Sequence, residues 1–228
     1  MKIIAIETTT QACSAALLLD GIIKERYQWA DRQHTQLLLP MLTSLLEEAG
    51  LRQTQLDAVA FCRGPGSFTG CRIGASVAQA IALATDIPVI MISSLQCLAQ
   101  GAYRKFGAKQ VLSAIDARMN EIYWASYQLG PCGTMAEQSA EKLSAPQQLA
   151  TVNSTNFVGV GSGWDSYSDS INSLFQPPRS YRYYLQCYPR AYDVALLAGL
   201  AYQQNQFFSA EQAVPLYLRE TVVYKKSQ

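Results

Sequence analysis

The spacing of apolar and polar residues predicts a chain that begins with strands and then alternates helices with buried strands. Asp20-Gly21 separates two β-rich runs and is typical of a hairpin turn, whereas Gly50 follows a long apolar stretch and suits the position after a helix end. For the first half, the expected elements are strands at 2–8, 13–19 and 22–29, a helix at 35–49, a strand at 57–62, a helix at 68–85, a strand at 88–92 and a helix at 94–106.

The second half repeats the opening of the first. A shift of 109 positions places 5–7 on 114–116 and Gly21 on Gly130, so both halves open with an apolar strand that ends in an acid. The repeat predicts two α/β domains, with the last helix able to pack back on the first domain. The expected domains are 1–106 and 107–228, and the later elements are a strand at 157–161, a helix at 164–175, a strand at 185–188 and a helix at 191–204.

Composition narrows the class of protein. Of the 228 residues, 49% are apolar and only 15% are charged, which predicts a compact core and indicates that part of the surface is reserved for a partner. The formal net charge of +1 argues against a protein that grips a nucleic acid alone, because such proteins neutralise many phosphates. Any such contact is expected to be local or shared with a partner.

The cysteines and the apolar runs predict the cellular compartment of the protein. The six cysteines form no CxxC pair and lie mostly in apolar runs, which is typical of buried free thiols in a reducing cytoplasm. No apolar h-region follows Met1 and no stretch of 18 apolar residues occurs, so we expect neither a signal peptide nor a membrane span.

Glycines and hydroxyl residues crowd the loop before the helix at 68–85. Gly64 and Gly66 permit backbone angles that other residues avoid, and Ser67 or Thr69 can cap the helix. Free N–H groups at a helix start can hold an anion, which makes these four residues a candidate phosphate-binding loop. The alternative is a tight turn without a ligand. The segment is not a P-loop, because no Gly-Lys-Ser/Thr follows at the required spacing.

The helices at 35–49 and 68–85 are candidates for a protein-binding surface. The first is apolar over more than the one face that a surface helix needs, and Pro40 is expected to kink it or delay its start. The second carries glycine or alanine at every fourth position, which lets another helix approach closely. The alternative is that both stripes pack within their own domain. The residues assigned to this interface are Leu38, Met41, Leu42, Leu45, Gly70, Gly74, Val77, Ala78, Ile81 and Ala82.

Side chains suited to catalysis are few. Residues 7–10, Glu-Thr-Thr-Thr, occupy the turn that holds Mg²⁺ and phosphate in actin-like and sugar-kinase folds, but no glycine lets the backbone close around a phosphate. This argues against kinase activity and favours a structural role for Glu7. His34 is the only histidine, and no HxxxH or HExxH motif is present, so we expect neither a metal site nor a catalytic triad.

A basic and aromatic stretch near the end allows two interpretations. Residues 179–192 interleave three arginines with five tyrosines, and the tail at 219–226 adds positive charge. Such a stretch can stack on RNA bases. The alternative, which we favour, is that the tyrosines pack against a neighbouring domain with their hydroxyls outward.

Four segments resemble the bacterial TsaB (YeaZ) family, in the right order and along nearly the full chain. Residues 4–14 look like the family's opening strand-turn-strand, with Glu7 where relatives commonly have Asp. The loop at 64–74 is similar to its most distinctive segment, and 116–123 and 215–219 resemble its second-domain and C-terminal motifs.

The resemblance implies a fold and a role. The fold is a two-lobed α/β fold of the actin-like ATPase, hexokinase and Hsp70 type (ASKHA, ribonuclease H-like), with duplicated βββαβαβα units. The role is that of a non-catalytic cytoplasmic partner of TsaD, the family's catalytic paralogue, and of the ATPase TsaE. TsaD transfers the threonylcarbamoyl group to N6 of adenosine 37 in tRNAs that read ANN codons.

The resemblance also bears on cofactors and partners. TsaD-like proteins hold a metal with a histidine pair that this sequence lacks, so no cofactor of its own is expected, and a nucleotide only at an interface shared with TsaD. Family members use first-lobe helices to bind TsaD and pair with themselves when TsaD is missing. Contact with tRNA is then indirect, through the complex. A small-molecule kinase of the same superfamily and an M22-type peptidase stay open as alternatives.

Overall fold

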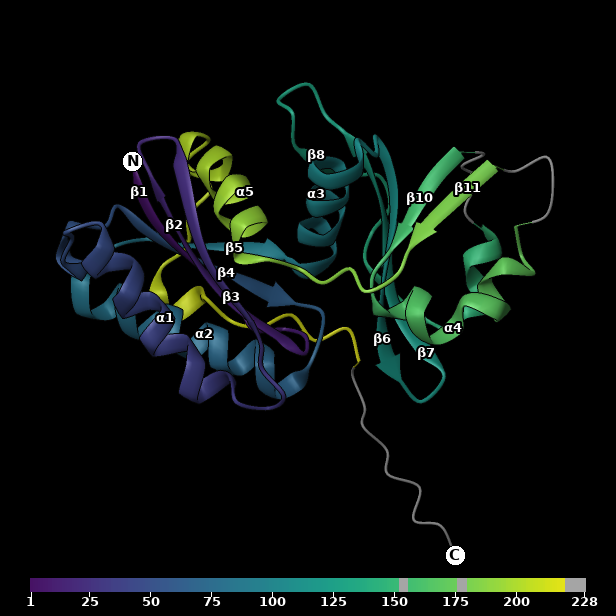
Figure 1. Ribbon diagram of the computed structural model, residues 1–228, viewed down its shortest axis with the longest axis horizontal. Helices are drawn as coiled ribbons and strands as arrows, with labels where there is room; N and C mark the ends of the chain where they lie inside the picture. Colours follow the sequence, from purple (N-terminus) through teal and green to yellow (C-terminus); the bar gives the residue numbers. More distant parts are fainter. Residues whose placement is uncertain (152–155, 176–179, 220–228) are drawn as a thin grey trace, which may run out of the picture.

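Two lobes, each built around one β-sheet, make up the protein (Figure 1). The computed structural model describes residues 1–151, 156–175 and 180–219. None of the helices in these ranges is long and apolar enough to cross a membrane.

The first sheet confirms the strands expected at the start of the chain. Its order is β3-β2-β1-β4-β5, with β1, β2 and β3 antiparallel and with β4 and β5 parallel to β1. Asp20 and Gly21 form the predicted turn, and both have positive φ. The bounds are β1 (Lys2–Glu7), β2 (Ala12–Leu19), β3 (Ile22–Trp29), β4 (Ala58–Gly64) and β5 (Val89–Ser93).

Helices cover both faces of this sheet, because successive strand residues point to opposite sides. Ile4 and Ile6 share a core with α1 and α2, whereas Ile3 and Ala5 pack against α5 on the other side. Figure 1 shows α1 and α2 next to each other below the sheet. The elements are α1 (His34–Glu48), α2 (Phe68–Thr85) and α5 (Ala191–Gln203), with short 3-10 turns η1 (Gln53–Gln55) before β4 and η3 (Ala210–Gln212) beside α2.

The second sheet repeats the topology of the first. Its order is β11-β10-β6-β7-β8, and the short extra strand β9 pairs with β7. Without β9, this order taken from the other end is again third, second, first, fourth and fifth strand. The duplicated α/β unit is therefore confirmed, although the short turn η2 stands where the first lobe has α1. The bounds are β6 (Gln110–Arg118), β7 (Glu121–Leu129), β8 (Met135–Glu137), β9 (Lys142–Ser144, which pairs with β7), η2 (Pro146–Thr151), β10 (Asn156–Val160), α4 (Ser162–Asn172) and β11 (Ser180–Tyr184).

The lobes share their connecting helices. On α3 (Ser94–Phe106), Cys97 faces the core of the first lobe, whereas Leu95 and Leu98 belong to the core of the second. In exchange, α5 comes from the second half of the chain and covers the first sheet. A boundary near Gly107 thus follows the repeat in the sequence, but α3 packs on both sides of it.

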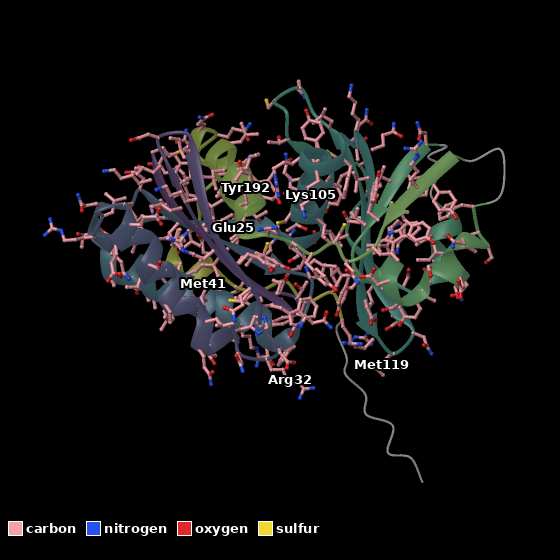
Figure 2. The ribbon with its side chains drawn as sticks, viewed as in Figure 1. Glu25, Arg32, Met41, Lys105, Met119 and Tyr192 are labelled. Atoms are coloured by element: carbon pink, nitrogen blue, oxygen red, sulfur yellow. The ribbon has the colours of Figure 1, made fainter. Side chains whose placement is uncertain are left out.

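Ion pairs join the start of α5 to α3 and β3. The guanidinium of Arg104 on α3 donates two hydrogen bonds of 2.8 Å to the carboxylate of Asp193. At the other side of α5, Glu25 on β3 accepts from the backbone N–H of Tyr192 at 3.1 Å and pairs with Arg190 at 2.6 Å. Figure 2 shows Glu25 and Tyr192 near each other beside α5.

One of the two effects expected of Pro40 and the position of one strand were wrong. Helix α1 begins at His34, so Pro40 lies inside it and does not delay its start, whereas the kink stays a prediction. The strand expected at 185–188 lies earlier, as β11, where it pairs in parallel with β10. The residues before and after position 184 both suit a strand, and pairing with β10 places the strand before it.

Candidate functional site: helices α1 and α2 and the loop before α2

The loop between β4 and α2 is held by the turn between β1 and β2. Ser67 caps α2, since its hydroxyl accepts from Gly70 N at 3.3 Å. The backbone N–H of Ser67 donates to the carbonyl oxygen of Thr9 at 2.7 Å, and Thr8 Oγ1 donates to Gly70 O at 2.8 Å. These bonds tie the loop to its own chain.

The small residues at the start of α2 also pack against this turn. A Cβ on Gly66 would lie 2.4 Å from the carbonyl oxygen of Thr9, and a Cβ on Gly70 would lie 2.0 Å from that of Thr8. A Cβ on Gly74 would lie 2.8 Å from Thr8 Oγ1. The glycines therefore leave room for Thr8 and Thr9 in the turn between β1 and β2. The assignment of Gly70 and Gly74 to a partner interface is corrected on this ground.

The candidate phosphate-binding residues do not form an open cradle. Gly64 is buried with a φ of +100°, and a Cβ on it would meet Cys71 Sγ at 3.1 Å. Ser67 and Thr69 are exposed, but the N–H of Ser67 is already bonded to Thr9. The geometry is that of a packed strand-to-helix turn. Anion binding here stays a prediction.

The remaining residues assigned to the interface lie mostly in the core of the first lobe. The structure places Val77 at an intermediate exposure and buries the other seven against β1, β2 and β4. Apolar residues on a helix that covers a sheet turn toward that sheet, because this removes the most apolar surface from water. The buried side chains are Leu38, Met41, Leu42, Leu45, Ala78, Ile81 and Ala82.

The sides of α1 and α2 that face away from the sheet carry a different set of residues. Leu39 on α1 is 56% exposed and Leu83 on α2 is 66% exposed, and the two helices also expose small uncharged side chains. Among residues 34–46 and 68–85 the only charged side chain is Arg72. The exposed residues of this outer face, a name kept below, are Leu39, Thr43, Ser76, Ala80 and Leu83.

Sequence reasoning missed a cluster at the start of α2. The Arg72 guanidinium lies 3.7 Å from the centroid of the Phe68 ring and donates through Nε to Tyr217 Oη at 2.9 Å. Phe68 and Arg72 stand at positions i and i+4 of a predicted helix, which indicates that they are neighbours. Tyr217 is 145 residues away in the chain, so spacing gives no sign of it.

A buried acid lies at the end of β1. Glu7 has no exposed surface, and its Oε1 accepts from the backbone N–H of Thr9 at 2.7 Å and from the Thr9 hydroxyl. Its Oε2 has no hydrogen-bond partner among the described residues. Burial raises the pKa of Glu7 to about 7, while the bonds from Thr9 oppose the rise. The structural role expected of Glu7 agrees with these contacts.

The single histidine, His34, is hydrogen-bonded within the protein. His34 Nε2 lies 2.9 Å from the carbonyl oxygen of Thr10 and 3.2 Å from that of Ala12. Since both neighbours are acceptors, this nitrogen carries the proton and cannot act as a base. Within residues 1–151, 156–175 and 180–219, no group of three or more His, Cys, Asp and Glu is placed to hold a metal ion.

A glutamate, Glu141, lies at the carboxyl ends of β4 and β5 in the first sheet. Ligands of open α/β sheets bind beyond the carboxyl ends of parallel strands. Here Glu141 accepts from the hydroxyl of Ser93 at the end of β5 and pairs with Arg63 of β4 at 3.2 Å. Burial raises the pKa of Glu141, and Arg63 opposes the rise.

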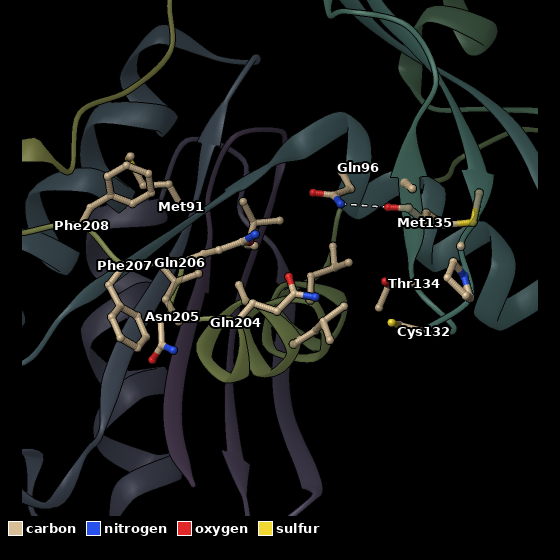
Figure 3. A pocket seen from close by; sticks show the side chains of 18 residues that line it. Met91, Gln96, Cys132, Thr134, Met135, Gln204, Asn205, Gln206, Phe207 and Phe208 are labelled. Atoms are coloured by element: carbon tan, nitrogen blue, oxygen red, sulfur yellow. Dashed lines mark hydrogen bonds between the residues drawn. The ribbon is translucent and has the colours of Figure 1, made fainter.

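A groove of about 610 Å³ lies elsewhere between the lobes (Figure 3). It is lined by β5, the end of α5 and the connection from β7 to β8, and it shares no residue with the outer face. Gln96 closes one side by donating to the carbonyl oxygen of Met135 at 2.9 Å. None of the lining residues is an Asp, Glu, His, Lys or Arg, so the groove offers no acid or base for catalysis.

The tyrosines after residue 180 pack within the protein. Tyr183 stacks on Trp164 with ring centroids 5.6 Å apart, and Tyr184 stacks on Phe106 at 3.7 Å. Tyr188 meets Trp29 edge-on at 5.1 Å. These contacts agree with the packing interpretation. Arg179 and the tail beyond Arg219 lie outside the described residues.

Comparison with known proteins gives consistent results. Residues 21–220 match the family model described as TsaD, tRNA N6-adenosine threonylcarbamoyltransferase. The chain is 40% identical to the tRNA threonylcarbamoyladenosine biosynthesis protein TsaB of Escherichia coli, over 99% of this chain and 98% of that one. It is 37% identical to TsaB of Haemophilus influenzae, over 99% and 97%.

Solved structures extend this similarity to the fold. The structure described as YeaZ from Pseudomonas aeruginosa has a TM-score of 0.88 and 42% sequence identity, and the match covers 95% of this chain and 99% of that one. Another structure with the same score and identity is described as an uncharacterized protein from that organism with similarity to peptidase YeaZ.

Proposed function

The chain belongs to the TsaB (YeaZ) family, within the wider group of TsaD-like domains, and from this premise we propose that it is a non-catalytic partner of a TsaD-type paralogue. Its relatives act in tRNA threonylcarbamoyladenosine biosynthesis, and this chain has its role in the same pathway. In the proposed complex it activates the transferase that forms N6-threonylcarbamoyladenosine at position 37 of tRNAs reading ANN codons.

The outer face of α1 and α2 carries this proposal. The two helices expose two leucines and several small side chains, and Arg72 is the only charge between residues 34 and 46 and between 68 and 85. Such a face can be covered by a partner without burying an unpaired charge, apart from Arg72 itself. Small side chains such as Ser76 and Ala80 let the helices of a partner approach closely.

Several observations support a role without chemistry of its own. His34 cannot act as a base at Nε2, and Glu7 is buried behind Thr9. Glu141 lies beside the carboxyl ends of β4 and β5, where it is paired with Arg63. A nucleotide then binds only at a surface shared with the TsaD-type paralogue, and no cofactor belongs to this chain alone.

The further members of the proposed assembly follow from the same role. A TsaE-type ATPase joins the pair, and tRNA is met through the complex and not by this chain alone, in agreement with its net charge of +1. Without the paralogue, the outer face covers itself in a homodimer. The assembly works in the cytoplasm.

Substitutions on the outer face test the proposal. Ala80→Arg and Leu83→Glu place a charge where a partner would exclude water, and each should weaken binding to the purified TsaD-type paralogue by at least about tenfold in calorimetry. Leu185→Glu is the matched control, since Leu185 is 53% exposed and lies on neither helix. Both variants should also lower the yield of modified tRNA in a mixture with TsaD, TsaE and tRNA.

The outcome that contradicts the proposal is equally definite. If Ala80→Arg and Leu83→Glu keep the melting temperature of the parent chain and bind the paralogue as tightly, α1 and α2 do not form the interface. Turnover of Mg-ATP by the chain alone would instead support the kinase alternative. Peptide hydrolysis that survives His34→Ala and a chelator would show that the chain has a catalytic group outside the residues considered above.

A further inference from the structure

The exposed cluster at the start of α2 has the composition of a binding hot spot. Phe68 is 55% exposed and Tyr217 is 45% exposed, and their ring centroids lie 5.5 Å apart. The Arg72 guanidinium stacks on Phe68 and bonds to the Tyr217 hydroxyl. Tyrosine and arginine are enriched among the residues that contribute most to protein–protein affinity.

Contacts on both sides hold Tyr217 in this position. The backbone N–H of Leu216 donates to the carbonyl oxygen of Arg63 at 2.8 Å, which fixes the segment against the end of β4. Two residues further on, Arg219 pairs with Glu121 of the second lobe at 2.7 Å and donates to Ala117 O at 3.1 Å. The cluster is therefore ordered before any partner binds, which reduces the entropy that binding must overcome.

No carboxylate of the described residues forms an ion pair with Arg72. Its Nε is bonded to Tyr217, and its two terminal nitrogens have no recorded partner among the described residues. Helix α2 contains no acidic residue, and the acidic residues of α1 are Glu47 and Glu48, of which Glu48 pairs with Lys24 and Arg26. If a partner covers the outer face, Arg72 loses water and needs an acceptor from that partner.

We propose that the interface extends from the outer face over Phe68, Arg72 and Tyr217, and that a carboxylate of the partner binds the two free nitrogens of Arg72. This inference rests on the proposed function and adds one requirement to it. The partner is a different chain that presents an acidic residue within an otherwise uncharged helical face. The planar guanidinium, oriented by Phe68 and Tyr217, suits a carboxylate with two parallel bonds.

Charge substitutions at Arg72 test the requirement for a carboxylate. With the full-length chain and the purified TsaD-type paralogue, Arg72→Glu should weaken binding by roughly 100-fold and Arg72→Gln by roughly tenfold, because a buried acid is left without its partner. Arg182→Glu is the matched control, since Arg182 is exposed on β11 in the other lobe. Added salt should weaken the parent complex more than the complex of Arg72→Gln.

A second variant tests the C-terminal segment. Tyr217→Phe keeps the ring beside Phe68 and removes only the hydroxyl that orients Arg72, so it should weaken binding about three- to tenfold. In the variant Arg72→Gln that hydroxyl no longer orients a guanidinium. Adding Tyr217→Phe to Arg72→Gln should therefore cost little more, and full additivity would contradict the coupling.

The result separates this inference from the proposed function. If Ala80→Arg weakens binding while Arg72→Glu and Tyr217→Phe bind like the parent chain, the interface exists but does not include the cluster. If none of the three weakens binding, the interface itself is wrong. If Arg72→Glu weakens self-association in sedimentation but not binding to the paralogue, the carboxylate belongs to a second copy and the inference is overturned.

Discussion

Replacing Glu7 by glutamine should make the protein more stable above neutral pH. The carboxyl group is fully buried, its Oε2 has no hydrogen-bond partner among the described residues, and its pKa rises from 4.5 to about 7. Burial causes the rise, because a carboxylate loses its hydration in the core. Glutamine has nearly the same shape and keeps an oxygen that can accept from Thr9.

The size of the effect follows from the pKa. The folded chain holds the proton up to about pH 7, whereas the unfolded chain loses it near 4.5, so the free energy of unfolding falls as the pH rises between these values. One pKa unit corresponds to about 1.4 kcal/mol, so the loss at pH 7 and above is roughly 3 kcal/mol. It is absent below 4.5. The variant Glu7→Gln removes this loss.

Urea unfolding at two pH values tests the reasoning. Near pH 8 the midpoint of Glu7→Gln should exceed that of the parent chain by an amount equivalent to roughly 2–3 kcal/mol, and at about pH 4.5 the two should nearly coincide. Glu47→Gln, at an exposed position of α1, is the control for loss of a carboxylate. A difference between variant and parent that is the same at both pH values would refute the assignment of the effect to the ionisation of Glu7.

Two further substitutions test the packing. Gly70→Ala should destabilise the protein by about 3 kcal/mol or more in thermal unfolding, because the new Cβ would lie 2.0 Å from the carbonyl oxygen of Thr8. Gly21→Ala, whose Cβ meets nothing within 4 Å, should cost only about 1 kcal/mol through its positive φ, and equal losses would contradict the packing argument. Arg104→Ala should cost roughly 3 kcal/mol at neutral pH by leaving the buried Asp193 carboxylate unpaired, and Arg104→Ala together with Asp193→Asn should recover part of the loss.

Local elements were readable from the sequence because their determinants are close together in the chain. Apolar, β-rich runs placed the strands of the first lobe, Asp20-Gly21 indicated a hairpin turn, and Ser67 was one of two candidate caps for α2. The shift of 109 positions predicted the repeat, which the two sheets confirm by sharing one topology. The family could be identified for the same reason, since each of its motifs is a continuous segment.

The candidate interface shows where this reasoning stops. Periodicity showed that α2 has a smooth face, but it could not show that Thr8 and Thr9 occupy the space beside Gly66 and Gly70. In the same way, the apolar residues of α1 were recognised, while their burial against the sheet depends on how the helix lies. A pattern along a helix gives the relative direction of side chains and not the identity of the neighbour.

Tertiary structure alone brought together the groups that now define the site. Tyr217 reaches Arg72 across 145 positions, and Glu141 reaches Ser93 across 48. The buried state of Glu7 likewise depends on elements that close over it from elsewhere in the fold. The sequence determined which segments form helices and strands, because that depends on nearby residues. The three-dimensional packing decided which charges are paired, buried or exposed, because each of these depends on residues that only folding brings into contact.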